Sequence, residues 1–113
     1  ASKPNKRYPH APSMEPTPMI NPEIIRYSST MKKDWEGCLS IPGVRGLVPR
    51  SESITVRYLT RDGATVESDF QDFIARIIQH EVDHLNGICF LDRMESTKEI
   101  VTEKEFLKII ASY

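Results

Sequence analysis

The pentapeptide at residues 80–84, with the sequence HEVDH, constrains this chain more than any other segment. Side chains four residues apart lie on one face of a helix, so the imidazoles of His80 and His84 would point toward one metal ion. Glu81, beside the first histidine, would reach a water on that ion and act as a general base. A polar surface helix that carries two histidines by chance is the alternative interpretation.

The residues around this pentapeptide predict a helix that is largely buried. Phe73 and Ile77 share a stripe with the two histidines at helical spacing. A second, adjoining apolar stripe contains Ile74, Ile78, Val82 and Leu85. We expect the helix to begin after a cap at Asp69 or Asp72 and to end near Asn86-Gly87. Buried imidazoles need partners, and one metal ion would satisfy both.

A catalytic metal site of this kind usually has three protein ligands and one open position, so a third ligand is needed. Cys38 is favoured because a thiolate binds Fe²⁺ or Zn²⁺ well, and because Gly37 lets the backbone approach a ligand closely. It lies in a stretch with the composition of a turn, residues 34–43. His10, Cys89 and many carboxylates are alternatives, although Cys89 lies in an apolar run and is interpreted as a small buried residue.

The remaining pattern predicts one α+β domain. The expected elements are strands at 19–27, 54–59 and 64–68, a polar loop at 28–33, a short apolar run at 88–91 and an amphipathic helix at 98–112. Asp62-Gly63 would join the last two strands in a hairpin. Residues 1–18 hold five of the eight prolines and are expected to be irregular. We therefore expect a single domain over residues 1–113, in which antiparallel strands pack around a central HExxH metal-binding helix and a second helix lies at the C-terminal end.

Composition argues against several classes of function. The chain has 15 basic and 16 acidic residues and a net charge of −1, without the basic surplus of a nucleic-acid footprint. No apolar run approaches the ~18 residues of a membrane span, and the first residues lack the apolar stretch of a signal peptide. Two cysteines fit a reducing compartment better than a disulfide framework. The sequence after His84 also lacks the extended motif of the metzincins.

Two motifs together resemble one known family. The string EGCLS at residues 36–40, followed by HEVDH at 80–84, is similar to the second and third motifs of the peptide deformylases. The resemblance spans roughly residues 16–94. Its further matching positions are 20–23, 42–50, Gln79, Asn86-Gly87 and 90–92. Other H-E-x-x-H hydrolases do not share the EGCLS string, so the pair of motifs is highly specific.

This resemblance implies roles for the matching residues. The metal ligands would be Cys38, His80 and His84. Glu81 would be the catalytic acid and base, and the backbone N–H of Leu39 would donate to the oxyanion. Glu36 and Arg50 would support the cysteine loop as a paired acid and base. The resemblance also implies one Fe²⁺ per chain, with Zn²⁺ or Ni²⁺ as substitutes.

The function implied by the resemblance is removal of the formyl group from the formyl-methionine that begins a nascent peptide. Such peptides and the ribosome would be the partners, in the bacterial cytoplasm or a bacterium-derived organelle. Ile77, one turn before Glu81, would line a pocket for the methionine side chain together with Phe73. Ordinary core packing is the alternative for both residues.

One part of the family pattern is missing. Deformylases carry a first motif, a glycine-rich stretch ending in a glutamine that donates to the formyl oxygen, whereas the glutamines here are Gln71 and Gln79, on other segments. We therefore expect a missing N-terminal segment or a second chain, and weak or no activity of this chain alone. The alternatives are another metallohydrolase such as a peptidase, a metal-binding protein without catalysis, and a fragment that stabilises a partner chain.

Overall fold

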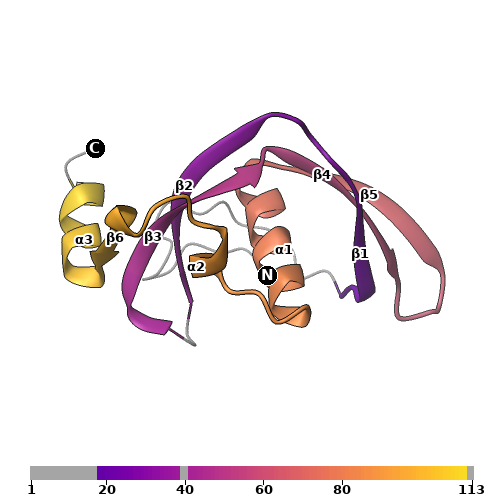
Figure 1. Cartoon of the computed structure of the whole chain (residues 1–113). Helices are drawn as coiled ribbons and strands as arrows, with labels where there is room; N and C mark the ends of the chain where they lie inside the picture. The colour runs from indigo at the N-terminus through magenta and orange to yellow at the C-terminus, as the bar shows by residue number, and fades with distance from the viewer. Residues whose placement is uncertain (1–17, 39–40, 112–113) are drawn as a thin grey trace.

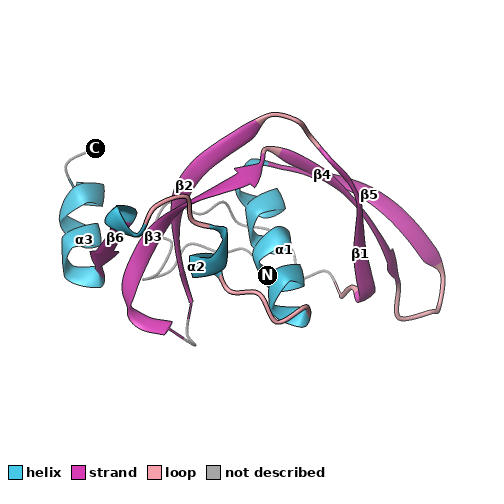
Figure 2. Cartoon of the chain, in the orientation of Figure 1, coloured by secondary structure: helices cyan, strands magenta, loops and turns pink. Residues whose placement is uncertain are grey.

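The computed structural model describes residues 18–38 and 41–111, and these form an α+β fold, as predicted. The strands are β1 (Ile20–Tyr27), β2 (Met31–Cys38), β3 (Ile41–Ser51), β4 (Ser53–Leu59), β5 (Thr65–Gln71) and β6 (Ile100–Thr102). The helices are α1 (Asp72–Leu85), α2 (Phe90–Arg93), the 3₁₀ turn η1 (Thr97–Glu99) and α3 (Glu103–Ala111). The strands form two three-stranded antiparallel sheets, and α3 lies at the C-terminal end (Figures 1 and 2).

The first sheet has the strand order β1-β4-β5 and contains the three strands that the sequence predicted. β4 and β5 pair from Ser53 opposite Gln71 to Leu59 opposite Thr65, and the predicted Asp62-Gly63 turn closes the hairpin. Side chains alternate along a strand, so every second residue of β4 enters the core. Ile54, Val56 and Tyr58 are buried there with Ala75 of α1.

The second sheet has the strand order β2-β3-β6, and two sequence-based expectations about it were wrong. The stretch at 34–43, interpreted as a turn, consists mostly of the long hairpin strands β2 and β3. The loop expected at 28–33 ends early, because β2 already begins at Met31. Residues 31–34 are exposed and mostly polar, a composition that is typical of a loop. They are nevertheless strand, because their main chain pairs with β3 as far as Ser51.

Helix α1 begins and ends close to the predicted positions, but its N-terminus lacks the predicted side-chain cap. Its N-cap is Gln71, which makes no side-chain capping bond, so Asp69 and Asp72 were the wrong residues. Asp72 instead adopts a φ of 54°, and its backbone N–H donates to the carbonyl of Glu52 at 2.7 Å. The predicted end near Asn86-Gly87 is confirmed, because Asn86 is the C-cap.

The C-terminal segment differs from the helix expected at 98–112. The chain first forms η1 and β6, and α3 begins only at Glu103. Ile100 and Val101 are β-branched, which favours a strand, and they pair with Gly46 and Arg45 of β3. The helical spacing of apolar residues therefore predicted a helix that begins about one and a half turns too early.

The two sheets lie on either side of α1, and strands of both sheets arch over the helix (Figure 1). α1 contacts β1, β4 and β5 of the first sheet and β3 of the second. No helix in the described part of the chain combines the length and apolar character that crossing a bilayer requires. The proline-rich segment predicted at 1–18 lies outside the described residues, apart from Pro18.

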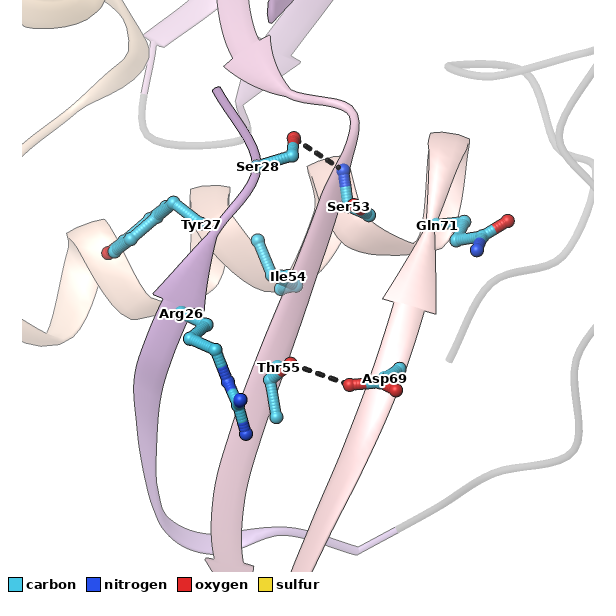
Figure 3. Close-up of a pocket in the computed structure, with 8 residues that line it drawn as sticks. All are labelled: Arg26, Tyr27, Ser28, Ser53, Ile54, Thr55, Asp69 and Gln71. Carbon is cyan, nitrogen blue, oxygen red and sulfur yellow. Dashed lines mark hydrogen bonds between the residues drawn. The ribbon is translucent and has the colours of Figure 1, made fainter. Parts of the chain in front are cut away.

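A polar hollow of about 330 Å³ lies across the first sheet, between β1, β4 and β5 (Figure 3). Among its lining residues, Thr55 of β4 donates to Asp69 of β5 at 2.5 Å, and Arg26 and Tyr27 come from β1. The residues that line this hollow include no predicted site residue.

Candidate metal centre

The three side chains predicted as metal ligands lie together in the structure. Cys38 is the last residue of β2, and His80 and His84 occupy successive turns of α1. One ligand atom of each residue lies within 4.8 Å of the other two, and Cys38 Sγ is 3.4 Å from His84 Nε2. The two imidazole rings are 4.6 Å apart between centroids. Strand β2 and helix α1 therefore bring one thiol and two imidazoles to one point.

This donor set fits a single divalent transition metal. Zn–S and Zn–N bonds of ~2.3 and ~2.0–2.1 Å place neighbouring donors of a tetrahedral site about 3.5 Å apart, which matches the distance between Cys38 and His84. Cys38 and Cys89 form no disulfide, so the thiol at this point is available as a ligand. Cys38 and His80 are buried, and His84 is the half-buried member of the three.

Glu36 fixes the orientation of the first histidine. Its Oε1 lies 2.8 Å from His80 Nδ1, so the ring donates a proton there and Nε2 is the nitrogen left for a ligand. Phe90 of α2 lies parallel to the His80 ring, with 6.3 Å between centroids. A carboxylate behind a metal-binding histidine sets its tautomer and increases its basicity. This contact places Glu36 directly behind the predicted metal ligand.

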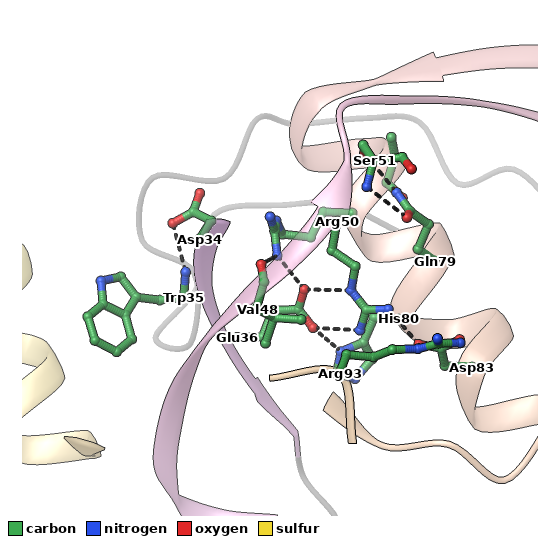
Figure 4. Close-up of polar contacts among 12 residues, drawn as sticks. Asp34, Trp35, Glu36, Val48, Arg50, Ser51, Gln79, His80, Asp83 and Arg93 are labelled. Carbon is green, nitrogen blue, oxygen red and sulfur yellow. Dashed lines mark hydrogen bonds and ion pairs between the residues drawn. The ribbon is translucent and has the colours of Figure 1, made fainter. Parts of the chain in front are cut away.

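Glu36 is also the centre of a buried ion-pair network (Figure 4). Arg50 of β3 donates to both of its oxygens, at 2.9 and 3.0 Å, and reaches Asp83 of α1 at 2.5 Å. Arg93 of α2 donates twice to Asp83, at 2.9 and 3.0 Å. The described residues include no buried side-chain nitrogen or oxygen without a hydrogen-bond partner. The pairing of Glu36 with Arg50, expected from the family resemblance, is therefore present and extends further than expected.

The network determines the ionisation of its acidic groups. Burial raises the pKa of Glu36, but hydrogen bonds from His80 and Arg50 outweigh it and lower the pKa to about 2. Burial also raises the pKa of Asp83, but hydrogen bonds from Arg93 and Arg50 outweigh this effect and lower the pKa. Burial would lower the pKa of His80, but the hydrogen bond to Glu36 raises it. The hydrogen bond between Glu36 and His80 thus contributes to both shifts: it lowers the pKa of the carboxyl group and raises that of the imidazole.

The lowered pKa of Glu36 predicts acid sensitivity of the fold. The ordinary value of 4.5 applies to the unfolded chain and about 2 to the folded one, so the stabilisation is complete above pH 4.5 and is lost as the pH falls toward 2. A shift of this size corresponds to about 3 kcal/mol. Urea denaturation of the apo protein between pH 6 and pH 2 measures it. Glu36→Gln should flatten this dependence, whereas the exposed Glu67→Gln should not, and an equally steep dependence in Glu36→Gln would contradict the assignment.

The other predicted site residues have less specific surroundings. Glu81 is exposed, and Phe73 and Ile77 are half-buried. Leu39, whose backbone N–H was predicted to donate to the oxyanion, lies outside the described residues. Gly37 was expected to let the backbone approach a ligand. In the structure a Cβ at Gly37 would lie 2.7 Å from Cδ of Arg45, so the close approach is made by that side chain.

Sequence reasoning missed the polar character of the buried face of α1. Its buried residues are Ala75, Arg76, Gln79, His80 and Asp83, whereas Leu85 of the predicted apolar stripe is 70% exposed. Gln79 accepts from the backbone N–H of Ser51 and donates to its carbonyl, at 3.2 and 2.9 Å. The available signal was Arg76, a charged residue set among isoleucines one helical turn before His80.

Comparison with known proteins identifies the family. The family model of the polypeptide deformylases matches residues 2–99. The chain belongs to the polypeptide deformylase family. Peptide deformylase 2 of Nostoc sp. is 54% identical over 110 residues, which are 97% of this chain and 62% of that protein. Peptide deformylase 2 of Shewanella oneidensis is 46% identical over 105 residues, covering 93% of this chain and 58% of the relative.

Solved structures agree with this family assignment. The crystal structure of a class I type b peptide deformylase from Acinetobacter baumannii with Met-Ala-Ser bound superposes with a TM-score of 0.79 and 57% identity. The superposed region covers 83% of this chain and 59% of the Acinetobacter baumannii deformylase. A deformylase from Thermotoga maritima gives a TM-score of 0.66 at 40% identity over 69% of this chain and 53% of its own length. The chain thus spans about three fifths of the length of the two curated deformylases from Nostoc sp. and Shewanella oneidensis.

Proposed function

We propose that this protein is a metal-dependent hydrolase that removes the formyl group from the N-terminal formyl-methionine of nascent peptides. The observation that carries the proposal is the convergence of Cys38, His80 and His84 within 4.8 Å of one another, with Glu81 next to the first histidine. Membership of the deformylase family supports the choice of a formyl amide as the bond that is cleaved. Nascent peptides are the proposed substrates, with the ribosome as their source.

We assign one metal ion to each chain, with Cys38, His80 and His84 as its ligands. Fe²⁺ is the proposed ion, and Zn²⁺ or Ni²⁺ would fit the same thiolate and imidazoles. Such an ion acidifies a bound water and polarises a carbonyl oxygen. With His80 and His84 as ligands, α1, which contacts strands of both sheets, is the proposed metal-binding helix of the fold. The proposed location is the bacterial cytoplasm or a bacterium-derived organelle.

Glu81 is the proposed acid and base. Glu81 is exposed on α1 and follows His80 directly in the sequence. Glu81 accepts the proton of the attacking water as the C–O bond to the formyl carbon forms. It then gives that proton to the departing amine as the C–N bond breaks, so the products are formate and a peptide with a free amino terminus. The backbone N–H of Leu39 is proposed to donate to the oxyanion.

A deformylation assay tests the proposal directly. The purified protein, loaded with Fe²⁺ in the absence of oxygen, is incubated with formyl-Met-Ala-Ser, and formate release is measured. The expected result is slow formate release, because the sequence lacks the glutamine donor of the family's first motif, and this release should cease when a chelator removes the metal. Cleavage of the unformylated peptide Met-Ala-Ser instead would identify a peptidase. Bound metal without formate release would leave a metal-binding protein and reject the hydrolase.

The substrate pocket gives a further prediction. If Ile77 and Phe73 border the methionine side chain, Ile77→Asp should raise KM for formyl-Met peptides at least about tenfold, because a carboxylate would face an apolar group. Ile74→Asp, on the neighbouring stripe of the same helix, is the matched control for the cost of a carboxylate on α1. Metal content and thermal unfolding are measured alongside. An unchanged KM in a folded Ile77→Asp variant would show that Ile77 does not border the substrate and is an ordinary core residue.

A further inference from the structure

The side chain of Arg76 is buried inside the protein, although it belongs to neither the predicted ligands nor the predicted catalytic groups. It is 5% exposed and donates to three acceptors. Nη1 lies 2.5 Å from Glu36 Oε2 and 2.8 Å from the carbonyl oxygen of Val48, and Nη2 lies 2.6 Å from the carbonyl oxygen of Lys32. A buried guanidinium is held in place only where its donors are used, and here they are used on two strands of the second sheet, β2 and β3.

The acceptors show what Arg76 connects. Lys32 and Glu36 lie on β2, and Val48 lies on β3, so the guanidinium joins α1 to both strands of the β2–β3 hairpin. Cys38, two residues beyond Glu36, belongs to the same hairpin. Arg76 therefore connects the helix that carries two of the proposed ligands to the hairpin that carries the third.

Arg76 also completes the hydrogen bonding of one carboxylate. Arg50 donates to both oxygens of Glu36, Arg76 adds a second donor to Oε2, and His80 Nδ1 adds a second donor to Oε1. Arg76 and His80 are four residues apart, so they lie on the same face of α1. One helix face thus holds both oxygens of Glu36, and a change in the carboxylate position on the Arg76 side would alter the contact on the His80 side.

We propose that Arg76 is a positioning residue of the metal centre: it holds the Glu36 carboxylate where it accepts from His80 Nδ1, which keeps His80 Nε2 bare for the metal. This inference rests on the proposed metal-binding function of Cys38, His80 and His84. Arg76 acts through Glu36 and touches neither the metal nor the substrate. A side chain that only stabilised the fold would leave the tautomer of His80 and the metal affinity of the folded protein unchanged.

The first measurement is Co²⁺ affinity, by competition with a chromogenic chelator under conditions where circular dichroism shows every variant to be folded. Arg76→Met should weaken binding about 10- to 100-fold, the usual effect of removing a partner behind a metal ligand. Arg76→Lys should lose less, because an ammonium keeps the charge but cannot reach all three acceptors. Two controls should bind as the parent does: Arg57→Met, an exposed arginine paired with Glu67, and Val56→Ala, which destabilises the core of the other sheet.

The second measurement reports the tautomer of His80 without any metal. Long-range ¹H–¹⁵N spectra of the apo protein, recorded at a pH where His80 is neutral, should show one tautomer protonated at Nδ1 in the parent and in Val56→Ala. In Arg76→Met the two tautomers should mix. Unchanged Co²⁺ affinity together with an unchanged tautomer in folded Arg76→Met would overturn the inference. If Arg76→Met does not fold, Arg76→Lys decides: affinity within threefold of the parent overturns it, and a larger loss supports it. A parent protein that binds no Co²⁺ would reject the metal centre itself.

Discussion

Glu81→Gln should lose most of its turnover and keep its metal. Removing a positioned acid and base commonly costs 10²- to 10⁴-fold in rate, and the substitution leaves the three ligand side chains as they are. Glu81 is exposed, so the change leaves no buried group unpaired and the fold should keep its stability. The measurements are kcat for formyl-Met-Ala-Ser and the metal content of the purified variant.

Two comparisons make the Glu81 experiment decisive. Cys38→Ala should lose both metal and turnover, because it removes the only thiol of the cluster among the described residues. Glu105→Gln, on the exposed face of α3, should retain both. Near-normal deformylation by Glu81→Gln would show that another group moves the proton. Loss of metal from that variant would show that Glu81 is itself a ligand.

Glu36→Gln should be the most destabilising single change in the site. Glu36 is 1% exposed and carries the charge that faces both Arg50 and Arg76. Breaking a buried ion pair by neutralising one partner typically costs 3–5 kcal/mol, because the opposite charge is left buried without compensation. Urea denaturation of the apo protein at pH 7 measures the loss in the free energy of unfolding.

The matched control for Glu36 is Glu67→Gln. Glu67 also pairs with two arginines, Arg26 and Arg57, at 4.0 and 3.2 Å, but all three side chains are at least 44% exposed. Pairs of that kind contribute ~0–1 kcal/mol, so the loss should be small. A Glu36→Gln variant that loses no more stability than Glu67→Gln would mean that the arginines find other partners when the carboxylate charge is removed.

The hydrophobic pattern predicted the first sheet well and the second poorly. Ile54, Val56 and Tyr58 alternate with polar residues, and this alternation reports one buried face directly. Strand β2 begins with Met31, Lys32, Lys33 and Asp34, all exposed. Its strand conformation comes from pairing with β3, a partner that follows later in the chain and that local patterns do not reveal.

The proximity of the three proposed ligands was predictable, but most of the contacts that surround them were not. His80 and His84 are identified by helical spacing, and Cys38 by a short motif that carries its own specificity. Arg76 and Asp83 look like surface residues by composition, because charged side chains are rarely buried. Arg76 contacts Glu36, 40 positions away in the sequence, and Asp83 contacts Arg50, 33 positions away, so only the folded chain brings these charges together.

The contact between Gln79 and Ser51 has a consequence for sequence tolerance. The Gln79 amide accepts from the N–H and donates to the C=O of a single residue, as a neighbouring strand would. It thereby recognises main chain, which every residue type except proline presents in the same way. Position 51 can therefore accept other small side chains while α1 stays docked. Position 79 has no such freedom, since even a glutamate would set a carboxylate oxygen against the carbonyl of Ser51.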